Sequence, residues 1–156
     1  MAFDPTEHPH RRLNPLNGSA VLVSPHRMKR PWQGPTDAAS EARGPAHDLG
    51  CYLCPSNARV TGDRNPDYSG TYVFPNDFAA VLPDTPEPGG SHPLFAAAPA
   101  RGEARVICFS PDHGASLPLL SHDRLRGVID SWAAQSEELG RLYTWVQLFE
   151  NKGAMM

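Results

Sequence analysis

A Cys-x-x-Cys pair, Cys51 and Cys54, is followed much later in this sequence by His113 at the end of a predicted strand. Thiolates and neutral imidazoles are the usual ligands of structural zinc, which is almost always four-coordinate and tetrahedral. The three residues therefore predict a zinc site that ties the loop of the two cysteines to the end of a strand. The alternative is that Cys51 and Cys54 are ordinary loop residues, because a lone Cys-x-x-Cys has modest specificity.

The sequence leaves the fourth ligand of such a site open. His47 lies close to the cysteines and is the local candidate, and the other possibility is a ligand from outside the 156 residues. The third cysteine, Cys108, lies within the β-prone run 104–109 and is most simply a small buried apolar residue. We expect four further histidines to be exposed to solvent, namely His8, His10, His92 and His122.

Charge and composition exclude several classes of protein. The formal net charge is −3, whereas a nucleic-acid-binding domain would show a basic excess. No apolar run approaches the roughly 20 residues that span a bilayer, and the polar segment 1–12 does not resemble a signal peptide. Three cysteines, an odd number, indicate reduced, metal-linked thiols rather than a disulfide framework. We therefore expect a cytoplasmic protein.

The pattern of apolar residues predicts an α/β (α+β) domain over residues 1–156, with a mixed, mainly antiparallel sheet and one packed helix. The 17 prolines and 13 glycines indicate long ordered loops. Ser121 is a suitable N-cap for a helix that runs to about Gly140, with Leu125, Val128, Ile129, Trp132, Leu139 and Leu142 at helical spacing. Short apolar runs between turn residues predict strands, of which the second and third form a hairpin: 20–24, 71–74, 78–82, 104–109 and 145–149. Loops are expected at 27–48 and 83–100, and a turn-rich arm at 1–18.

A basic segment follows the first predicted strand and carries three cations, Arg27, Lys29 and Arg30, around Met28. Guanidinium groups match phosphate oxygens in a two-pronged geometry, so this segment is a candidate site for a nucleotide phosphate. The alternative is a solvated basic loop, which is the more common outcome for such runs.

Two further segments are candidates for ligand contacts. Asn76 and Asp77 lie in a tight turn, where they either satisfy their own backbone or recognise ribose hydroxyls. The segment 150–153, Glu-Asn-Lys-Gly, follows the last predicted strand and is either a ligand-binding loop or the start of a polar loop.

Many of these motifs, in order along the chain, together resemble the galactose-1-phosphate uridylyltransferase family. The segments that carry the resemblance cover nearly the whole chain: His8-Pro9-His10-Arg11-Arg12, Asn14-Pro15-Leu16, 22–27, 29–34, Cys51-x-Leu53-Cys54, 59–63, 65–68, 71–74, 76–78, 108–113, 145–147 and 149–153.

The resemblance implies a histidine-triad-like fold, duplicated within a full-length chain that works as a homodimer. It implies exchange of uridylyl groups between UDP-glucose and galactose 1-phosphate in galactose metabolism, through a uridylyl-histidine; covalent catalysis of this kind splits one displacement into two. It further implies that Cys51, Cys54 and His113 are zinc ligands. The residues that match the family's UDP-sugar contacts are Arg27, Met28, Lys29, Arg30, Val60, Asn76, Asp77 and Asn151.

The sequence departs from the family pattern at its end. In the family a His-Pro-His segment soon follows the Asn-Lys-Gly turn; its first histidine is the fourth zinc ligand and its second is the nucleophile. These 156 residues end at Met156 before such a segment. We therefore expect the N-terminal portion of the transferase, the first and incomplete copy of its repeat, with no catalytic residue of its own and no activity alone.

Two other interpretations remain open from sequence. One is a non-catalytic, zinc-stabilised nucleotide-binding module that is complete at this length. The other is a diadenosine-tetraphosphate phosphorylase-like protein of the same fold, which the linked uridylyltransferase motifs disfavour.

Overall fold

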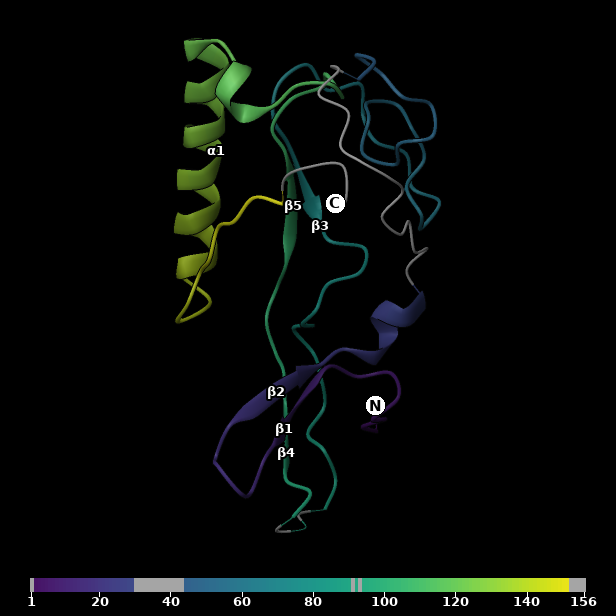
Figure 1. Cartoon of the computed structure of the whole chain (residues 1–156), viewed down its shortest axis with the longest axis vertical. Coiled ribbons are helices and arrows are strands. Elements are labelled where there is room, and N and C mark those ends of the chain that lie inside the picture. The colour runs from purple at the N-terminus through teal and green to yellow at the C-terminus, as the bar shows by residue number, and fades with distance from the viewer. Residues whose placement is uncertain (1, 30–43, 91, 93, 152–156) are drawn as a thin grey trace. The chain divides into compact units, whose positions relative to one another are not determined.

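The computed structural model describes residues 2–29, 44–90, 92 and 94–151 (Figure 1). The chain divides into two compact units, one of Met1–Trp32 with Pro75–Val106 and the other of Gln33–Phe74 with Ile107–Met156. The elements in chain order are β1 (His10–Leu13), β2 (Ala20–Val23), the 3-10 helix η1 (Pro25–Lys29), β3 (Tyr72–Pro75), β4 (Ala97–Pro99), β5 (Arg105–Cys108), the 3-10 helix η2 (Leu117–Leu119) and α1 (His122–Gly140).

The first unit contains a three-stranded antiparallel sheet in the order β2-β1-β4 (Figure 1). In its register His10 lies opposite Val23 on one side and Pro99 on the other. The predicted strand 20–24 is confirmed as β2. Strands β1 and β4 were not predicted, because three of the four residues of β1 are exposed and neither strand has an alternating apolar pattern.

His10 is central to the core of the first unit, with 1% of its surface exposed. Its Nδ1 lies 2.8 Å from the His8 carbonyl oxygen, and its Nε2 accepts a hydrogen bond from Arg12 Nε at 3.0 Å. The expectation that His10 is solvent-exposed was therefore wrong. His8 is half-buried, and only His92 and His122 are exposed as expected. A buried imidazole is tolerated here because both ring nitrogens are hydrogen-bonded.

The predicted hairpin 71–82 is also wrong. Its first strand is present as β3, but β3 pairs with β5, and residues 78–82 form turns and bends. The chain curls after Asn76, whose side-chain oxygen accepts from Phe78 N at 2.9 Å. Side chains then take up the carbonyl oxygens that a β ladder would use: Ser24 Oγ donates to Ala80 O, and His26 Nε2 contacts Ala79 O.

The predicted strand 104–109 is confirmed as β5, and the predicted helix 121–140 is confirmed as α1. Ser121 caps the helix and accepts a hydrogen bond from Arg124 N. Val128 and Leu139 are buried, whereas Ile129 is 51% exposed and Leu142 is 68% exposed. The predicted strand 145–149 is wrong, because this segment has no strand partner among the described residues.

The structure confirms the predicted fold class, a mixed α/β arrangement with an antiparallel sheet and one long helix. The assignment of residues 1–156 to one domain stays a prediction. Among the described residues, none of the helices combines the length and the apolar character of a membrane span.

Replacing Ser121 with alanine is expected to lower the free energy of unfolding by about 1 kcal/mol, because the N-cap hydroxyl satisfies an otherwise unpaired N–H of the first turn. Urea unfolding followed by circular dichroism at 222 nm measures the change. Ser136→Ala, inside α1, is the matched control and should stay within about 0.5 kcal/mol of the unsubstituted chain. Equal effects of the two variants would contradict the capping role.

Candidate functional site

The structure brings Cys51, Cys54 and His113 together in the second unit. Their ligand atoms all lie within 4.8 Å of one another, and Cys54 Sγ is 3.5 Å from His113 Nδ1. This is the set predicted from the sequence. Two soft sulfur donors and one imidazole fit zinc by their chemistry. The described residues therefore offer three ligand atoms to a metal.

The loop of the two cysteines is folded by its own backbone before any metal is considered. Cys54 N donates to Cys51 O at 3.4 Å, and Leu53 N lies 3.4 Å from Cys51 Sγ. The Asn57 side chain binds the carbonyl oxygens of Asp48 and Cys51 at 2.8 and 2.7 Å. These contacts hold both sulfurs on one side of the turn, which is the arrangement that a tetrahedral metal requires.

Burial raises the pKa of one of the two site thiols, that of Cys54. Cys54 is 3% exposed, and desolvation raises the pKa of its thiol, partly opposed by a backbone hydrogen bond from Asp48. Burial likewise raises the pKa of Cys108 and of Tyr68. Because low dielectric disfavours the thiolate, a bound cation would be the group that makes the charged form of Cys54 favourable.

His47, the local candidate for a fourth ligand, does not join this set. Its Nε2 lies 3.1 Å from the Pro55 carbonyl oxygen, and among the described residues the group that could hold a metal ion does not include it. Cys108 is buried as expected, with 8% of its surface exposed, and its Sγ lies 3.9 Å from the Leu53 carbonyl oxygen behind the cysteine loop.

The predicted phosphate segment lies in the first unit, as the 3-10 helix η1. Arg27, Met28 and Lys29 are exposed, and Lys29 Nζ pairs with Glu7 Oε2 at 2.6 Å. The hydrogen bonds from Ser24 and His26 to Ala80 and Ala79 fasten the start of this helix to the segment that follows Asn76 and Asp77. Arg30 lies outside the described residues.

The remaining predicted contacts are divided between the units. Asn76 and Asp77 are half-buried in the first unit, and Asn76 performs the turn chemistry expected of it. Val60 and Asn151 belong to the second unit, where Val60 is 43% exposed and Asn151 is exposed.

Sequence reasoning missed the role of Arg59. Its side chain is 12% exposed and pairs with Asp63 Oδ2 at 2.9 Å, and its guanidinium carbon lies 4.6 Å from the centre of the Phe74 ring. The ion pair holds the turn that presents Val60. The signal available in the sequence was the i,i+4 spacing of the two charges, which indicates pairing only when the tertiary fold is known.

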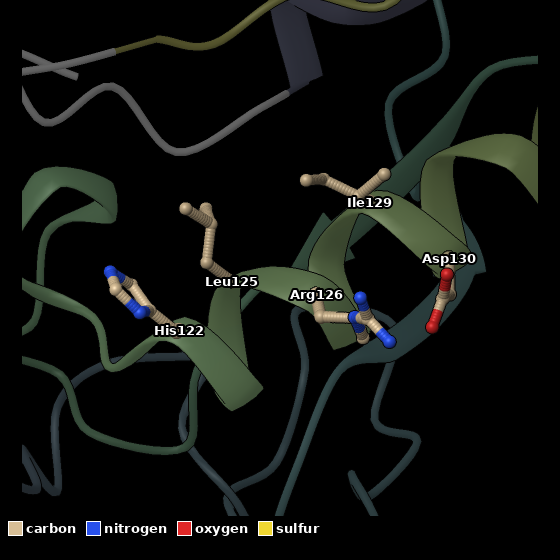
Figure 2. Close-up of a pocket in the computed structure, with 5 residues that line it drawn as sticks. All are labelled: His122, Leu125, Arg126, Ile129 and Asp130. Atoms are coloured by element: carbon tan, nitrogen blue, oxygen red, sulfur yellow. The ribbon is translucent and has the colours of Figure 1, made fainter.

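A hollow on the surface of α1 is lined by His122, Leu125, Arg126, Ile129 and Asp130. Figure 2 shows Leu125 and Ile129, one turn apart, projecting from the same side of the helix. None of the predicted site residues lines this hollow, so it takes no part in the site.

Comparison with known proteins bears on the identity of the chain. A model of the family described as "Galactose-1-phosphate uridyl transferase, N-terminal domain" matches residues 1–156. The galactose-1-phosphate uridylyltransferase of Haemophilus influenzae is 60% identical over 155 residues, which are 99% of this chain and 44% of that protein. The protein of the same name from Rattus norvegicus is 53% identical over 155 residues, 99% of this chain and 41% of that protein.

A solved structure described as "Structure of uridylyltransferase" matches with a TM-score of 0.57 at 24% identity, over 85% of this chain and 36% of that chain. At this identity the likeness shows a shared fold, which agrees with the predicted fold class. The chain spans less than half the length of these two curated relatives.

Proposed function

The chain belongs to the galactose-1-phosphate uridyl transferase family, whose N-terminal domain it matches over its whole length. We propose that it acts as the N-terminal portion of a UDP-glucose–hexose-1-phosphate uridylyltransferase. The reaction is a nucleotidyl transfer that moves UMP between UDP-glucose and galactose 1-phosphate. The observation that carries the proposal is the whole-length family match, together with 60% identity to a relative of that name.

The arrangement of the first unit supports nucleotide binding. The cations of η1 are tied by two side-chain hydrogen bonds to the segment that follows an Asn-Asp turn. Guanidinium and ammonium groups neutralise phosphate oxygens, and amide and carboxylate oxygens accept from ribose hydroxyls. We assign the UDP-sugar contacts to Arg27, Met28, Lys29, Arg30, Val60, Asn76, Asp77 and Asn151.

Zinc is the cofactor in this proposal, held by Cys51, Cys54 and His113. When bound, zinc would supply a structural cross-link between the cysteine loop and the segment after β5, because thiolate-rich sites of this kind stabilise folds. The residues of this chain hold that loop and bury the sulfur of Cys54.

The roles of the described residues in transfer are binding and orientation. Cations of η1 would offset the negative charge of the diphosphate, and the Asn-Asp turn would fix the ribose, so that the α-phosphorus is presented in one orientation. By resemblance, the attacking group is a histidine of the family's His-Pro-His segment, which is not among the residues assigned here. We further propose that the full-length enzyme is a homodimer and is cytoplasmic.

Calorimetric titration of the chain with UDP tests the nucleotide site without requiring turnover. We expect saturable binding that Arg27→Ala and Asp77→Ala each weaken by about 10- to 100-fold, because each variant removes a hydrogen bond in which at least one partner is charged. Arg126→Ala, which removes an exposed arginine of α1, is the charge-matched control and should leave UDP affinity unchanged. Failure of the chain to bind UDP, or equal weakening by Arg126→Ala, would contradict the assignment.

A further inference from the structure

Asp48 lies against two members of the three-residue metal set in the second unit. Its carbonyl oxygen accepts from Cys51 N at 3.1 Å. Its carboxylate faces His113, with Oδ2 4.0 Å from His113 Nε2. The chain on either side strengthens this arrangement, because His113 N donates to Ala46 O at 2.8 Å.

The imidazole of His113 therefore has two distinct sides. Nδ1 faces Cys54 Sγ at 3.5 Å, whereas Nε2 faces the carboxylate of Asp48. Metal-binding histidines usually donate the N–H of their other ring nitrogen to a carboxylate, carbonyl or water, which fixes the tautomer and the ring orientation. A histidine that binds through Nδ1 carries its proton on Nε2, the atom that lies nearer to Asp48.

We propose that Asp48 is a positioning residue of the metal site, whose carboxylate holds His113 in the tautomer and orientation that present Nδ1 to zinc. In this proposal Asp48 is not itself a ligand, since the described residues whose ligand atoms lie close enough to share a metal ion are Cys51, Cys54 and His113. This inference rests on the proposed zinc site.

The two carboxylate oxygens of Asp48 face different partners, so a single substitution can change one contact and keep the other. Oδ1 accepts from Gly50 N at 2.8 Å and shapes the turn before Cys51. Asp48→Asn keeps this oxygen and the backbone contacts, but it replaces the other oxygen with an NH2 group that cannot accept from His113. Asp48→Glu retains the negative charge and tests whether a carboxylate at this position restores zinc affinity.

Zinc affinity of the 156-residue chain, measured by competition with a chromophoric chelator, is the first readout. We expect Asp48→Asn to weaken zinc binding by about 10- to 100-fold and Asp48→Glu to recover part of the loss. Asp67→Asn, which neutralises an exposed aspartate of the same unit, is the charge-matched control and should bind zinc as the unsubstituted chain does. The urea midpoint of the metal-free Asp48→Asn variant should equal that of the metal-free parent.

The second readout is the visible spectrum of the Co²⁺-substituted chain. We expect Asp48→Asn to leave the positions of the ligand-field bands unchanged at saturating Co²⁺, because the donor atoms are the same. Shifted bands would make Asp48 a ligand and overturn the positioning role, as would an Asp48→Asn zinc affinity equal to that of the parent. If the unsubstituted chain bound no zinc, the zinc site itself would be overturned. That result differs from shifted bands and from an unchanged affinity of Asp48→Asn, which would contradict only the role of Asp48.

Discussion

Replacing Cys54 with serine is expected to lower the zinc affinity of the chain by about 100- to 1,000-fold, because the roughly 10–16 kcal/mol of a structural zinc site is shared among about four ligands. A serine hydroxyl remains protonated at neutral pH and is a poor ligand for zinc. Chelator competition measures the affinity, and loss of the sulfur-to-metal charge-transfer band of the Co²⁺ form reports the missing thiolate.

Cys108 provides the matched control for this experiment. It is a buried cysteine of the same unit, with 8% of its surface exposed against 3% for Cys54, but it does not belong to the metal set. Cys108→Ser is expected to cost some stability and to leave zinc stoichiometry and the Co²⁺ spectrum unchanged. If Cys108→Ser lost zinc as completely as Cys54→Ser, the three-residue set would be wrong.

Replacing Phe74 with alanine is expected to lower the free energy of unfolding by about 3–5 kcal/mol, the usual cost of deleting a buried aromatic side chain. Phe74 is 5% exposed, stacks on Tyr72 with ring centres 5.4 Å apart and lies beneath the Arg59 guanidinium. The variant therefore removes apolar burial and a cation–π contact together. Urea unfolding monitored by circular dichroism measures the loss.

Two comparisons separate these contributions. Phe95→Ala deletes the same side chain at a position that is 77% exposed, and it should change stability by no more than about 0.5 kcal/mol. Phe74→Leu retains apolar volume but loses the aromatic face, so its cost should be smaller, about 1–2 kcal/mol. A Phe74→Ala variant as stable as Phe95→Ala would show that this ring is not part of the core.

The elements that sequence reasoning predicted correctly are those with local causes. Helix α1 carries its own signals, a capping hydroxyl at Ser121 and apolar residues at helical spacing, so no distant contact was needed to find it. Strands β2, β3 and β5 each contain three or more adjacent apolar residues. The missed strand β1 has one buried residue, His10, and its pairing with β4 joins segments more than 80 residues apart.

The wrong hairpin at 71–82 has a specific cause. Residues 78–82 are apolar enough for a strand, but a strand also needs free backbone groups along its edge. The carbonyl oxygens of Ala79 and Ala80 are occupied by the side chains of His26 and Ser24, which lie more than 50 positions earlier. No pattern within residues 71–82 predicts contacts with side chains so far away in the sequence.

The candidate metal site likewise has features that local sequence predicts and features that depend on distant contacts. Sequence alone was enough to propose Cys51, Cys54 and His113 as a metal set, and linked motifs along nearly the whole chain were enough to indicate the family. The fold shows what spacing could not: the backbone of His113 is bound by the Ala46 carbonyl where its ring meets the two cysteines, whereas His47, the local candidate for a fourth ligand, is engaged by the Pro55 carbonyl. It also placed Asp48 behind the imidazole across more than 60 positions of sequence. Donor chemistry is a property of single residues, whereas the orientation of a ligand depends on groups that folding alone brings near.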